Sequence, residues 1–382
     1  MCIRDRSALG STQDSWDAYK TTNSHIQWDA TLEAYTAALP TKYQELIASV
    51  ANENTHYKKL DNSVLYALYT SREAIQMAGW TAGDFGINIG SSRGATQLFE
   101  QYYSAFAKAE TSSVHTSPST TLGNISSWVA QDLKTTGPDI SHSITCSTAL
   151  HAVINGIAWL CASMADRFLV GGSEAALTPF TIAQMQAMKL LPSKNTEQAY
   201  PCRALDKNKQ HNTMILGEGA GMACLELGEK ENALAHIQGF GYATEQLTHA
   251  ASLSANGSCF QKSMAMALGD RSPDMVDVIV MHAPGTVLGD QAEEEAIKTI
   301  FCNKIPLLTT NKWKIGHTFG ASGLLSMAMA IQLLQHQEFI SVPYLDQFSH
   351  PYVTAKTDQK IHTIMVNAVG FGGNAVSILL TR

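Results

Sequence analysis

Apolar positions along the chain alternate between helical spacing and short continuous runs typical of buried strands. Val64, Leu65, Leu68 and Ile75 recur at helical spacing and predict a helix over Asp61–Gly79. The same criterion predicts helices after Cys146 and over Gln261–Leu268, Glu293–Ile300 and Ser322–Leu334, and strands over Phe85–Gly90, Arg167–Gly172, Val276–Met281, Ile305–Thr309, Ile361–Val366 and Asn374–Leu380. Strands that alternate with helices indicate an α/β protein built in layers.

A charged, polar stretch over Glu226–Asn232 interrupts this pattern. Just before it, Met214–Leu227 carries closely spaced glycines and predicts a pair of strands with close backbone approach. A second cycle of strands and helices begins near Ala235. We therefore predict two similar halves, residues 1–228 and 229–382.

The first residues fit neither pattern. Met1–Arg6 lacks the apolar region of a signal peptide and does not read as a convincing strand. It leads directly into a turn at Ala8–Gly10 and a polar helix start at Ser11–Trp16. We interpret Met1–Arg6 as a gene-model scar or translated adapter sequence joined to an already truncated start.

The composition is that of a well-buried globular protein, with 45% hydrophobic and 15% charged residues. The 33 acidic and 26 basic residues give a net charge of −7, which argues against a nucleic-acid partner. No apolar run approaches the roughly 18–20 residues of a membrane span. The seven cysteines form no CxxC pair, which argues against a metal site and fits a reducing, cytoplasmic location.

One cysteine lies where a predicted extended segment turns into a buried helix. Within Ser143–His151, Cys146 follows a short extended run and precedes apolar positions at helical spacing. The free N–H groups and the positive dipole of a helix start favour the thiolate, which is the nucleophilic form. A small buried core cysteine is the alternative, and Cys146 alone does not decide between the two.

Three later features carry candidate chemistry. His282 follows a predicted strand beside a glycine turn, and His317 lies at a helix start within Gly316–Gly323, five residues after Lys312. Val369–Gly373 is a glycine-lined turn whose N–H groups are free to meet an anion. Each has a structural alternative: a turn-capping histidine, a helix cap rich in small residues, and a plain hairpin.

Taken together, these features suit acyl transfer. Such chemistry needs a thiolate, N–H donors for an oxyanion, and groups that stabilise a second charged intermediate. A cysteine protease needs one histidine rather than two and leaves Lys312 unexplained. The glycines of Gly217–Gly221 do not form a phosphate loop, because the Gly-Lys-Ser/Thr ending is absent.

The motifs resemble, in order, those of the elongating β-ketoacyl-[acyl carrier protein] synthases of the thiolase superfamily. The resemblance runs from about Ala8 to the C-terminus. It rests on Gly137–Ala149, Gly171–Glu174, Cys202–Lys207, Leu216–Met222, His282–Asp290, Lys312–His317 and Asn367–Gly373. It implies an αβαβα layered sandwich of two similar halves, with the first strand apparently missing because family members begin with an apolar strand before the position of Ala8.

The resemblance also implies a decarboxylating Claisen condensation. Cys146 would accept an acyl group from an acyl carrier protein, with the N–H groups of Cys146 and Phe371 as oxyanion hole. His282 and His317, as neutral rings, would stabilise the enolate formed from a malonyl thioester. Lys312 would orient His317. No metal and no organic cofactor are implied, and the active form would be a dimer.

Substrate contacts are implied for three further positions. Phe371, with Gly370, occupies the family's gate beside the acyl pocket, and Thr286 is one of its hydroxyls that contact pantetheine. Lys58 and Lys59 match a basic cluster that docks the acidic carrier protein. A solvated surface is the alternative for that lysine pair.

The chain departs from the family pattern at four positions. His142 and Thr145 stand where the nucleophile signature prefers an apolar and a small residue, and Pro284 replaces one pantetheine-binding threonine. Ser326 replaces the acid that pairs with the lysine. Lys312 is then compensated by Glu293 or Glu294, or by nothing, and we expect its pKa to be lowered relative to a typical member.

Three functional classes remain open. The departures favour a specialised polyketide or aryl-polyene synthase, often paired with an inactive chain-length-factor subunit as a heterodimer. The chain could itself be such a partner subunit, although these usually lose the cysteine that is present here as Cys146. A thiolase that uses coenzyme A would need a second cysteine near the C-terminal glycine turn, and Phe371 stands there without one.

Overall fold

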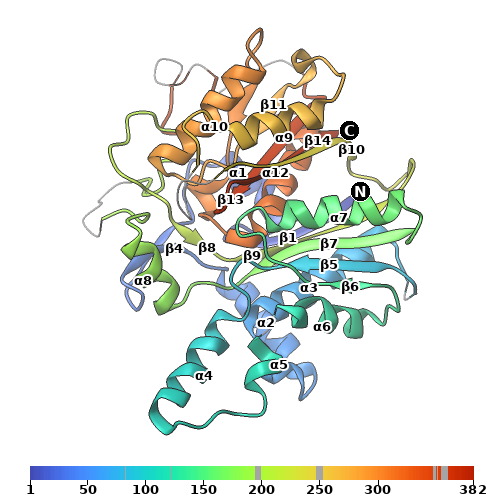
Figure 1. The fold of residues 1–382 in the computed structure, drawn as a ribbon, viewed down its shortest axis with the longest axis vertical. Coiled ribbons are helices and arrows are strands. Elements are labelled where there is room, and N and C mark those ends of the chain that lie inside the picture. The colour runs from blue at the N-terminus through green and yellow to red at the C-terminus, as the bar shows by residue number, and fades with distance from the viewer. Residues whose placement is uncertain are drawn as a thin grey trace.

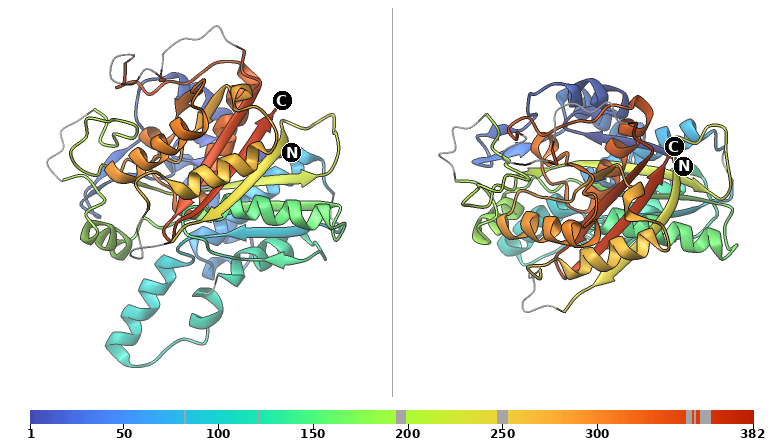
Figure 2. Two further views of the ribbon diagram at one scale, coloured as in Figure 1. Left: turned by 45° about the horizontal axis from the view of Figure 1, so that its top comes forward. Right: turned by 90° about the horizontal axis from the view of Figure 1, so that it is seen from above.

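Two mixed β-sheets are stacked face to face, one above the other in the view of Figure 1, with helices between them and on both outer faces (Figures 1 and 2). The structure is a computed structural model that describes residues 1–81, 83–120, 122–193, 199–246, 253–346, 350, 352–353 and 360–382. The six-stranded sheet has the order β2 (Gly10–Ser11), β1 (Cys2–Ser7), β9 (Gly219–Glu226), β7 (Arg167–Glu174), β5 (Gly86–Gly90) and β6 (Asp139–Ile140). The five-stranded sheet has the order β10 (His236–Thr244), β14 (Asn374–Thr381), β13 (Thr363–Gly370), β11 (Val278–Val280) and β12 (Leu307–Thr309).

The helices form the other three layers. Helices α7 (Thr148–Cys161) and α12 (Ser322–His336) pack between the two sheets. Helices α3 (Asn62–Ala78) and α6 (Gly123–Leu133) cover the outer face of the six-stranded sheet, while α9 (Ser258–Leu268) and α10 (Val287–Ile300) cover that of the five-stranded sheet. The predicted αβαβα sandwich is therefore confirmed.

Local sequence explains where the helices end and how closely they pack. The carboxylate of Asp61 accepts the Ser63 N–H (2.9 Å) at the start of α3, and Gly79 ends that helix in the left-handed conformation. In the central layer α12 is buried on all sides. A side chain at Gly323 would collide with Leu150, so the glycine lets α12 approach α7 closely.

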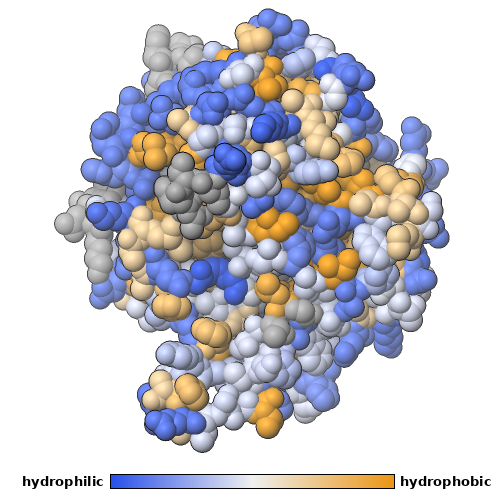
Figure 3. Space-filling view, in the orientation of Figure 1, coloured by the Kyte–Doolittle hydropathy of each residue, from blue (hydrophilic) through white to orange (hydrophobic). Residues whose placement is uncertain are grey.

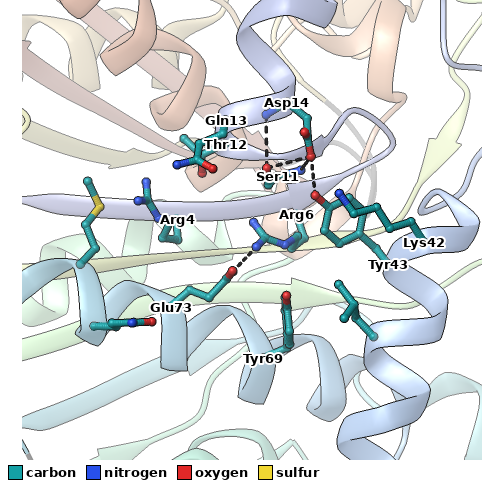
Figure 4. Close-up of a pocket in the computed structure, with 13 residues that line it drawn as sticks. Arg4, Arg6, Ser11, Thr12, Gln13, Asp14, Lys42, Tyr43, Tyr69 and Glu73 are labelled. Atoms are coloured by element: carbon teal, nitrogen blue, oxygen red, sulfur yellow. Dashed lines mark hydrogen bonds and ion pairs between the residues drawn. The ribbon is translucent and has the colours of Figure 1, made fainter.

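The prediction that the first strand is missing is wrong. Cys2–Ser7 forms β1 and pairs antiparallel with β9. Backbone pairing does not depend on side-chain polarity, and Ile3 supplies an apolar residue that is fully buried in the core. Two buried polar residues of β1 have side-chain partners: Thr12 donates to Asp5 (2.5 Å), and Arg6 pairs with Glu73 beside a surface pocket (Figure 4).

The Met214–Leu227 segment also differs from its prediction. It contains two strands, β8 (Leu216–Gly217) and β9, but they do not pair with each other. Instead, β8 joins a small sheet with β3 (Gln27–Asp29) and β4 (Ala34–Ala37). The remaining helices are α1 (Thr12–Lys20), α2 (Thr41–Glu53), α4 (Thr96–Ala109), α5 (Thr116–Thr120), α8 (Pro179–Ala187) and α11 (Lys312–Ile315).

Helices α4 and α5 project from the body of the molecule (Figure 1). Phe99, Tyr103 and Phe106 of α4 are exposed, and the space-filling view shows apolar residues among the polar ones on this projection (Figure 3). Apolar side chains of α4 therefore face solvent in the single chain.

Candidate active site

Cys146 lies between β6 and α7, at the point where the chain turns into the central layer. The turn is made at Thr145, whose φ of 47° is left-handed. Thr148, the first residue of α7, stabilises it, because its N–H and hydroxyl both donate to the Thr145 carbonyl (3.3 and 2.6 Å). The predicted position of the cysteine at a helix start is confirmed, and its side chain is buried.

Burial, not the helix start, dominates the acidity of this cysteine. Desolvation raises the pKa of Cys146 to about 12, and the negative charge of Glu174 acts in the same direction. The Lys312 charge and the N–H of Phe371 lower it by less. Burial therefore favours the thiol at neutral pH, and the helix start alone does not set the acidity of Cys146.

His282 follows β11 directly and is held through its backbone. Its N–H donates to Glu293 Oε1 (3.0 Å), and the next N–H, of Ala283, donates to Oε2 (2.9 Å). The amide of Asn367 on β13 also donates to Glu293 (3.1 Å). Burial raises the pKa of Glu293 to about 7 while these donors lower it. One buried carboxyl group thus fixes the turn that carries His282.

His317 lies between α11 and α12 and is fixed by the small sheet. Its N–H donates to the carbonyl of Ile215 (2.6 Å), and its carbonyl accepts from Gly217 (3.1 Å). The imidazole rings of His317 and His282 are 5.1 Å apart between centroids and nearly perpendicular. The two histidines, far apart in sequence, are therefore neighbours.

Both imidazoles are neutral at physiological pH. Burial, with the Lys312 charge, lowers the pKa of His317 to about 3. Burial lowers the pKa of His282 well below its usual value, with smaller effects from His317 and Lys312. Neutral rings can donate a hydrogen bond to a developing negative charge or accept a proton, but they bring no net charge to the site.

Lys312 is fully buried and has neutral partners. Its ammonium donates to Asn311 Oδ1 (2.9 Å) and Ser326 Oγ (3.3 Å). Burial lowers its pKa to about 8, and the Glu293 charge is the largest influence in the opposite direction. Of the two expected acids, Glu293 acts at a distance and Glu294 pairs elsewhere, with lysines on the surface.

The Val369–Gly373 turn joins β13 and β14 and lies against the nucleophile. The N–H of Phe371 lowers the pKa of the Cys146 thiol, and the Phe371 carbonyl accepts a hydrogen bond from the Thr145 hydroxyl (3.1 Å). A side chain at Gly370 would collide with the Thr145 hydroxyl and the Ile144 carbonyl and would crowd the backbone N–H of Cys146, so only glycine allows this approach. The backbone segments that carry the N–H groups of Phe371 and Cys146 therefore contact each other.

The nucleophile, the two histidines and the glycine turn border one cavity of about 580 Å³. Cys146, His282, His317 and Phe371 line it, as do Thr286 and Gly370. Pro284 also lines the cavity, at the position where the resemblance implies a hydroxyl. Its remaining walls are largely apolar, including Met188, Leu190, Met214 and Phe319. The arrangement provides a buried thiol, two neutral imidazoles and an apolar chamber for a substrate chain.

Lys58 and Lys59 lie elsewhere. They are exposed in a short 3₁₀ turn after α2, and neither lines the cavity. The Lys59 ammonium lies 3.2 Å from the His115 ring. Their predicted role in carrier docking stays a prediction.

Two absences among the described residues bear on other functions. Within them, no group of three or more His, Cys, Asp or Glu side chains is placed to hold a metal ion. No helix in the described ranges is long and apolar enough to cross a membrane.

Comparison with known proteins identifies the family. The model of the β-ketoacyl synthase N-terminal domain matches residues 3–231, and that of the C-terminal domain matches residues 234–344. The chain belongs to the β-ketoacyl synthase family. As a 3-oxoacyl-[acyl carrier protein] synthase homologue it is an acyltransferase, and at the level of the family its reaction is the condensation step of fatty acid or polyketide synthesis.

Individual relatives are distant. The synthase is 28% identical to 3-oxoacyl-[acyl-carrier-protein] synthase 2 of Coxiella burnetii over 349 residues, covering 85% of this chain and 83% of that protein. A β-ketoacyl synthase structure from Burkholderia phymatum superposes with a TM-score of 0.87 at 20% identity, covering 100% and 98% of the two chains. The ishigamide ketosynthase/chain length factor gives 0.85 at 18%, with the same coverage. These structures share the fold.

Two buried acids of the synthase hold backbone segments at the site, a role that the sequence did not predict. Glu174, at the end of β7, accepts the N–H groups of Ser92 (2.8 Å), Arg93 (3.0 Å) and Gly320 (2.8 Å) and so ties the two halves together near His317. Glu293 holds the His282 turn. The sequence does contain one indication that Glu293 is buried. It lies among apolar residues on the face of α10 that packs inward.

Proposed function

We propose that this synthase joins an acyl group held on Cys146 to a two-carbon unit from malonyl-acyl carrier protein, with loss of CO₂. The observation that carries the proposal is the convergence of Cys146, His282 and His317 on one largely apolar cavity. The geometry suits a reaction that alternates between a covalent thioester and a buried enolate.

In the first half-reaction the sulfur of Cys146 attacks an acyl thioester of the carrier protein. Because the resting group is a thiol with a pKa of about 12, its proton must leave as the sulfur–carbon bond forms. A neutral imidazole in the cavity can take that proton and return it to the departing carrier thiol. The N–H groups of Cys146 and Phe371 would hold the oxyanion of the tetrahedral intermediate.

In the second half-reaction the malonyl thioester loses CO₂, and the electron pair of the broken carbon–carbon bond remains as an enolate. Hydrogen bonds from neutral His282 and His317 would stabilise its oxygen, with Lys312 adding positive charge nearby. The enolate carbon attacks the acyl-cysteine, forms the new carbon–carbon bond and expels the Cys146 thiolate. One proton from solvent then restores the thiol.

The carrier's pantetheine arm would enter past Thr286, and Phe371 with Gly370 would gate the acyl chamber. Lys58 and Lys59 would contribute to docking the acidic carrier protein. We further propose a cytoplasmic dimer, either of two identical chains or with a chain-length-factor-like subunit. The ishigamide ketosynthase/chain length factor shares this fold, which supports considering the heterodimer. The departures from the family pattern at Thr145, Pro284 and Ser326 fit a specialised polyketide branch.

A non-catalytic partner subunit is the second candidate, and the intact Cys146 argues against it. The test is incubation of the protein with acyl- and malonyl-acyl carrier proteins, followed by mass spectrometry of Cys146 and of the carrier. Acylation of Cys146 together with a β-ketoacyl product two carbons longer supports condensation. Acylation without extension indicates a transferase or an impaired partner, and neither product indicates the non-catalytic subunit. Cys146→Ser is the control.

A further inference from the structure

Thr145 precedes the nucleophile in the first half of the chain and contacts Phe371, which belongs to the second half. Its hydroxyl donates to the carbonyl of Phe371 (3.1 Å), 226 positions away in sequence. The backbone N–H of the same Phe371 lowers the pKa of the Cys146 thiol, which places it beside the sulfur. Thr145 therefore holds the Phe371 carbonyl while the Phe371 N–H faces the nucleophile.

The backbone at Thr145 makes this contact possible at a conformational cost. A β-branched residue rarely adopts a positive φ, and the φ of 47° here is an outlier for threonine. Two hydrogen bonds from Thr148 to the Thr145 carbonyl hold this conformation (3.3 and 2.6 Å). A strained residue held by its surroundings beside the reacting atom points to a role at the site rather than to fold stability alone.

The absence of a side chain at Gly370 leaves room for the Thr145 side chain. A Cβ at Gly370 would lie 1.8 Å from the Thr145 hydroxyl oxygen and 3.1 Å from the Cys146 nitrogen. The turn also closes on itself through a hydrogen bond from Gly373 to Gly370 (3.1 Å). The hydroxyl of Thr145 adds a polar side-chain contact between this turn and the segment that carries the nucleophile.

We propose that Thr145 is a positioning residue: its hydroxyl holds the Phe371 turn so that the Phe371 N–H stays aligned with that of Cys146 for the oxyanion. The inference rests on the proposed function, because an oxyanion forms only if Cys146 accepts acyl groups. It assigns a role to a threonine at a position where the family pattern prefers a small residue.

Two reactions of the same thiol separate this role from a structural one. Alkylation of Cys146 by iodoacetamide passes through no oxyanion, whereas acylation by hexanoyl-pantetheine does. Thr145→Val keeps the shape and removes the hydroxyl. We expect the acylation rate of this variant to fall about 10- to 100-fold, which is no more than the fall caused by removing a whole oxyanion donor. The alkylation rate should stay within about two-fold of wild type or rise. Thr145→Ser should recover most of the acylation rate.

A matched control removes a similar hydroxyl-to-carbonyl hydrogen bond on the surface. The hydroxyl of Thr299, an exposed residue of α10, donates to the Glu295 carbonyl (2.9 Å), and Thr299→Val should leave both rates unchanged. If Thr145→Val folds poorly, Thr145→Ala is the second variant, since it also lacks the hydroxyl and removes the β-branch.

Three results would decide the matter. Wild-type acylation in the Thr145→Val or Thr145→Ala variant would overturn the proposal, and so would an equal fall in acylation and alkylation, which indicates general loss of structure. A wild-type protein that is alkylated but never acylated would instead refute the proposed function. A selective fall in acylation with rescue by serine supports the positioning role.

Discussion

The ammonium group of Lys312 lies 3.3 Å from the hydroxyl of Ser326, with no carboxylate hydrogen-bonded to it among the described residues. A buried charge with neutral partners is costly, since hydroxyl and amide oxygens replace only part of its hydration. This explains why burial lowers the pKa of Lys312 to about 8. The charge is therefore kept at some expense to stability, which is expected of a residue that serves a site rather than the fold.

We expect Lys312→Met to stabilise the protein at pH 7 and to impair condensation. A lowered pKa of about 8, against 10.5 ordinarily, corresponds to about 3 kcal/mol of destabilisation at neutral pH. The loss of hydrogen bonds to Asn311 and Ser326 offsets part of this, which leaves a gain of about 1–2 kcal/mol. Urea unfolding at pH 7 measures it.

The pH dependence of that gain has a defined sign. Between about pH 8 and pH 10.5 the unfolded chain binds the proton that folded Lys312 has lost, so the wild-type free energy of unfolding rises with pH. The advantage of Lys312→Met should therefore shrink by pH 9.5. Lys58→Met, at an exposed lysine, should show no such change. A Lys312→Met variant less stable than wild type at pH 7 would contradict this account.

The raised pKa of Cys146 predicts how its alkylation by iodoacetamide depends on pH. With a pKa of about 12, the thiolate fraction rises about tenfold for each pH unit across pH 6–10, and the rate should rise with it. Mass spectrometry of the peptide that contains Cys146 reads the rate site by site, with exposed Cys161 as internal reference. A rate that levels off below pH 8 would instead indicate the stabilised thiolate expected from the helix start.

The layers of the fold could be predicted from sequence because their signals are local. The apolar spacing and the terminal glycine of Asp61–Gly79 predicted α3 within one residue at each end. The strand β1 could not be predicted, because its Asp5 and Arg6 are buried only with partners from other elements. Asp5 is paired with Thr12 of α1, and Arg6 with Glu73 of α3.

The candidate site divides in the same way. Motif order indicated Cys146, His282 and His317 as neighbours, and all three line one cavity. Their protonation states depend on burial and on charges contributed by other segments, which motifs do not record. The carboxyl of Glu293 has no motif that specifies its contact with the His282 turn, because that contact exists only after α10 packs against β11 and β13.

The neutral state of His317 predicts a specific acid sensitivity. Its pKa of about 3 lies below the ordinary 6.5, so the unfolded chain binds an extra proton between these values and the free energy of unfolding falls as pH drops. At pH 5 this amounts to about 2 kcal/mol relative to pH 7. We expect His317→Gln to lose that part of the acid sensitivity and to condense about 10²- to 10³-fold more slowly.

The control for His317 is His362, which is exposed. His362→Gln should retain both the wild-type acid sensitivity and the wild-type condensation rate. Urea midpoints at pH 5 and pH 7 and a condensation assay with malonyl-acyl carrier protein provide the measurements. Equal acid sensitivity in wild type and His317→Gln would show that the ring is not buried as a neutral group.

The N-terminal strand supplies a prediction about the fold itself. Ile3 is fully buried in the core shared by the two halves, whereas Arg4 beside it is only partly buried. If β1 forms, Ile3→Ala removes buried methyl groups and leaves a cavity, which should lower the free energy of unfolding by about 2–4 kcal/mol. Arg4→Ala should change it by about 0.5 kcal/mol or less. The urea midpoint measures both, and an Ile3→Ala variant that unfolds with the wild type would show that Cys2–Ser7 does not pair with β9.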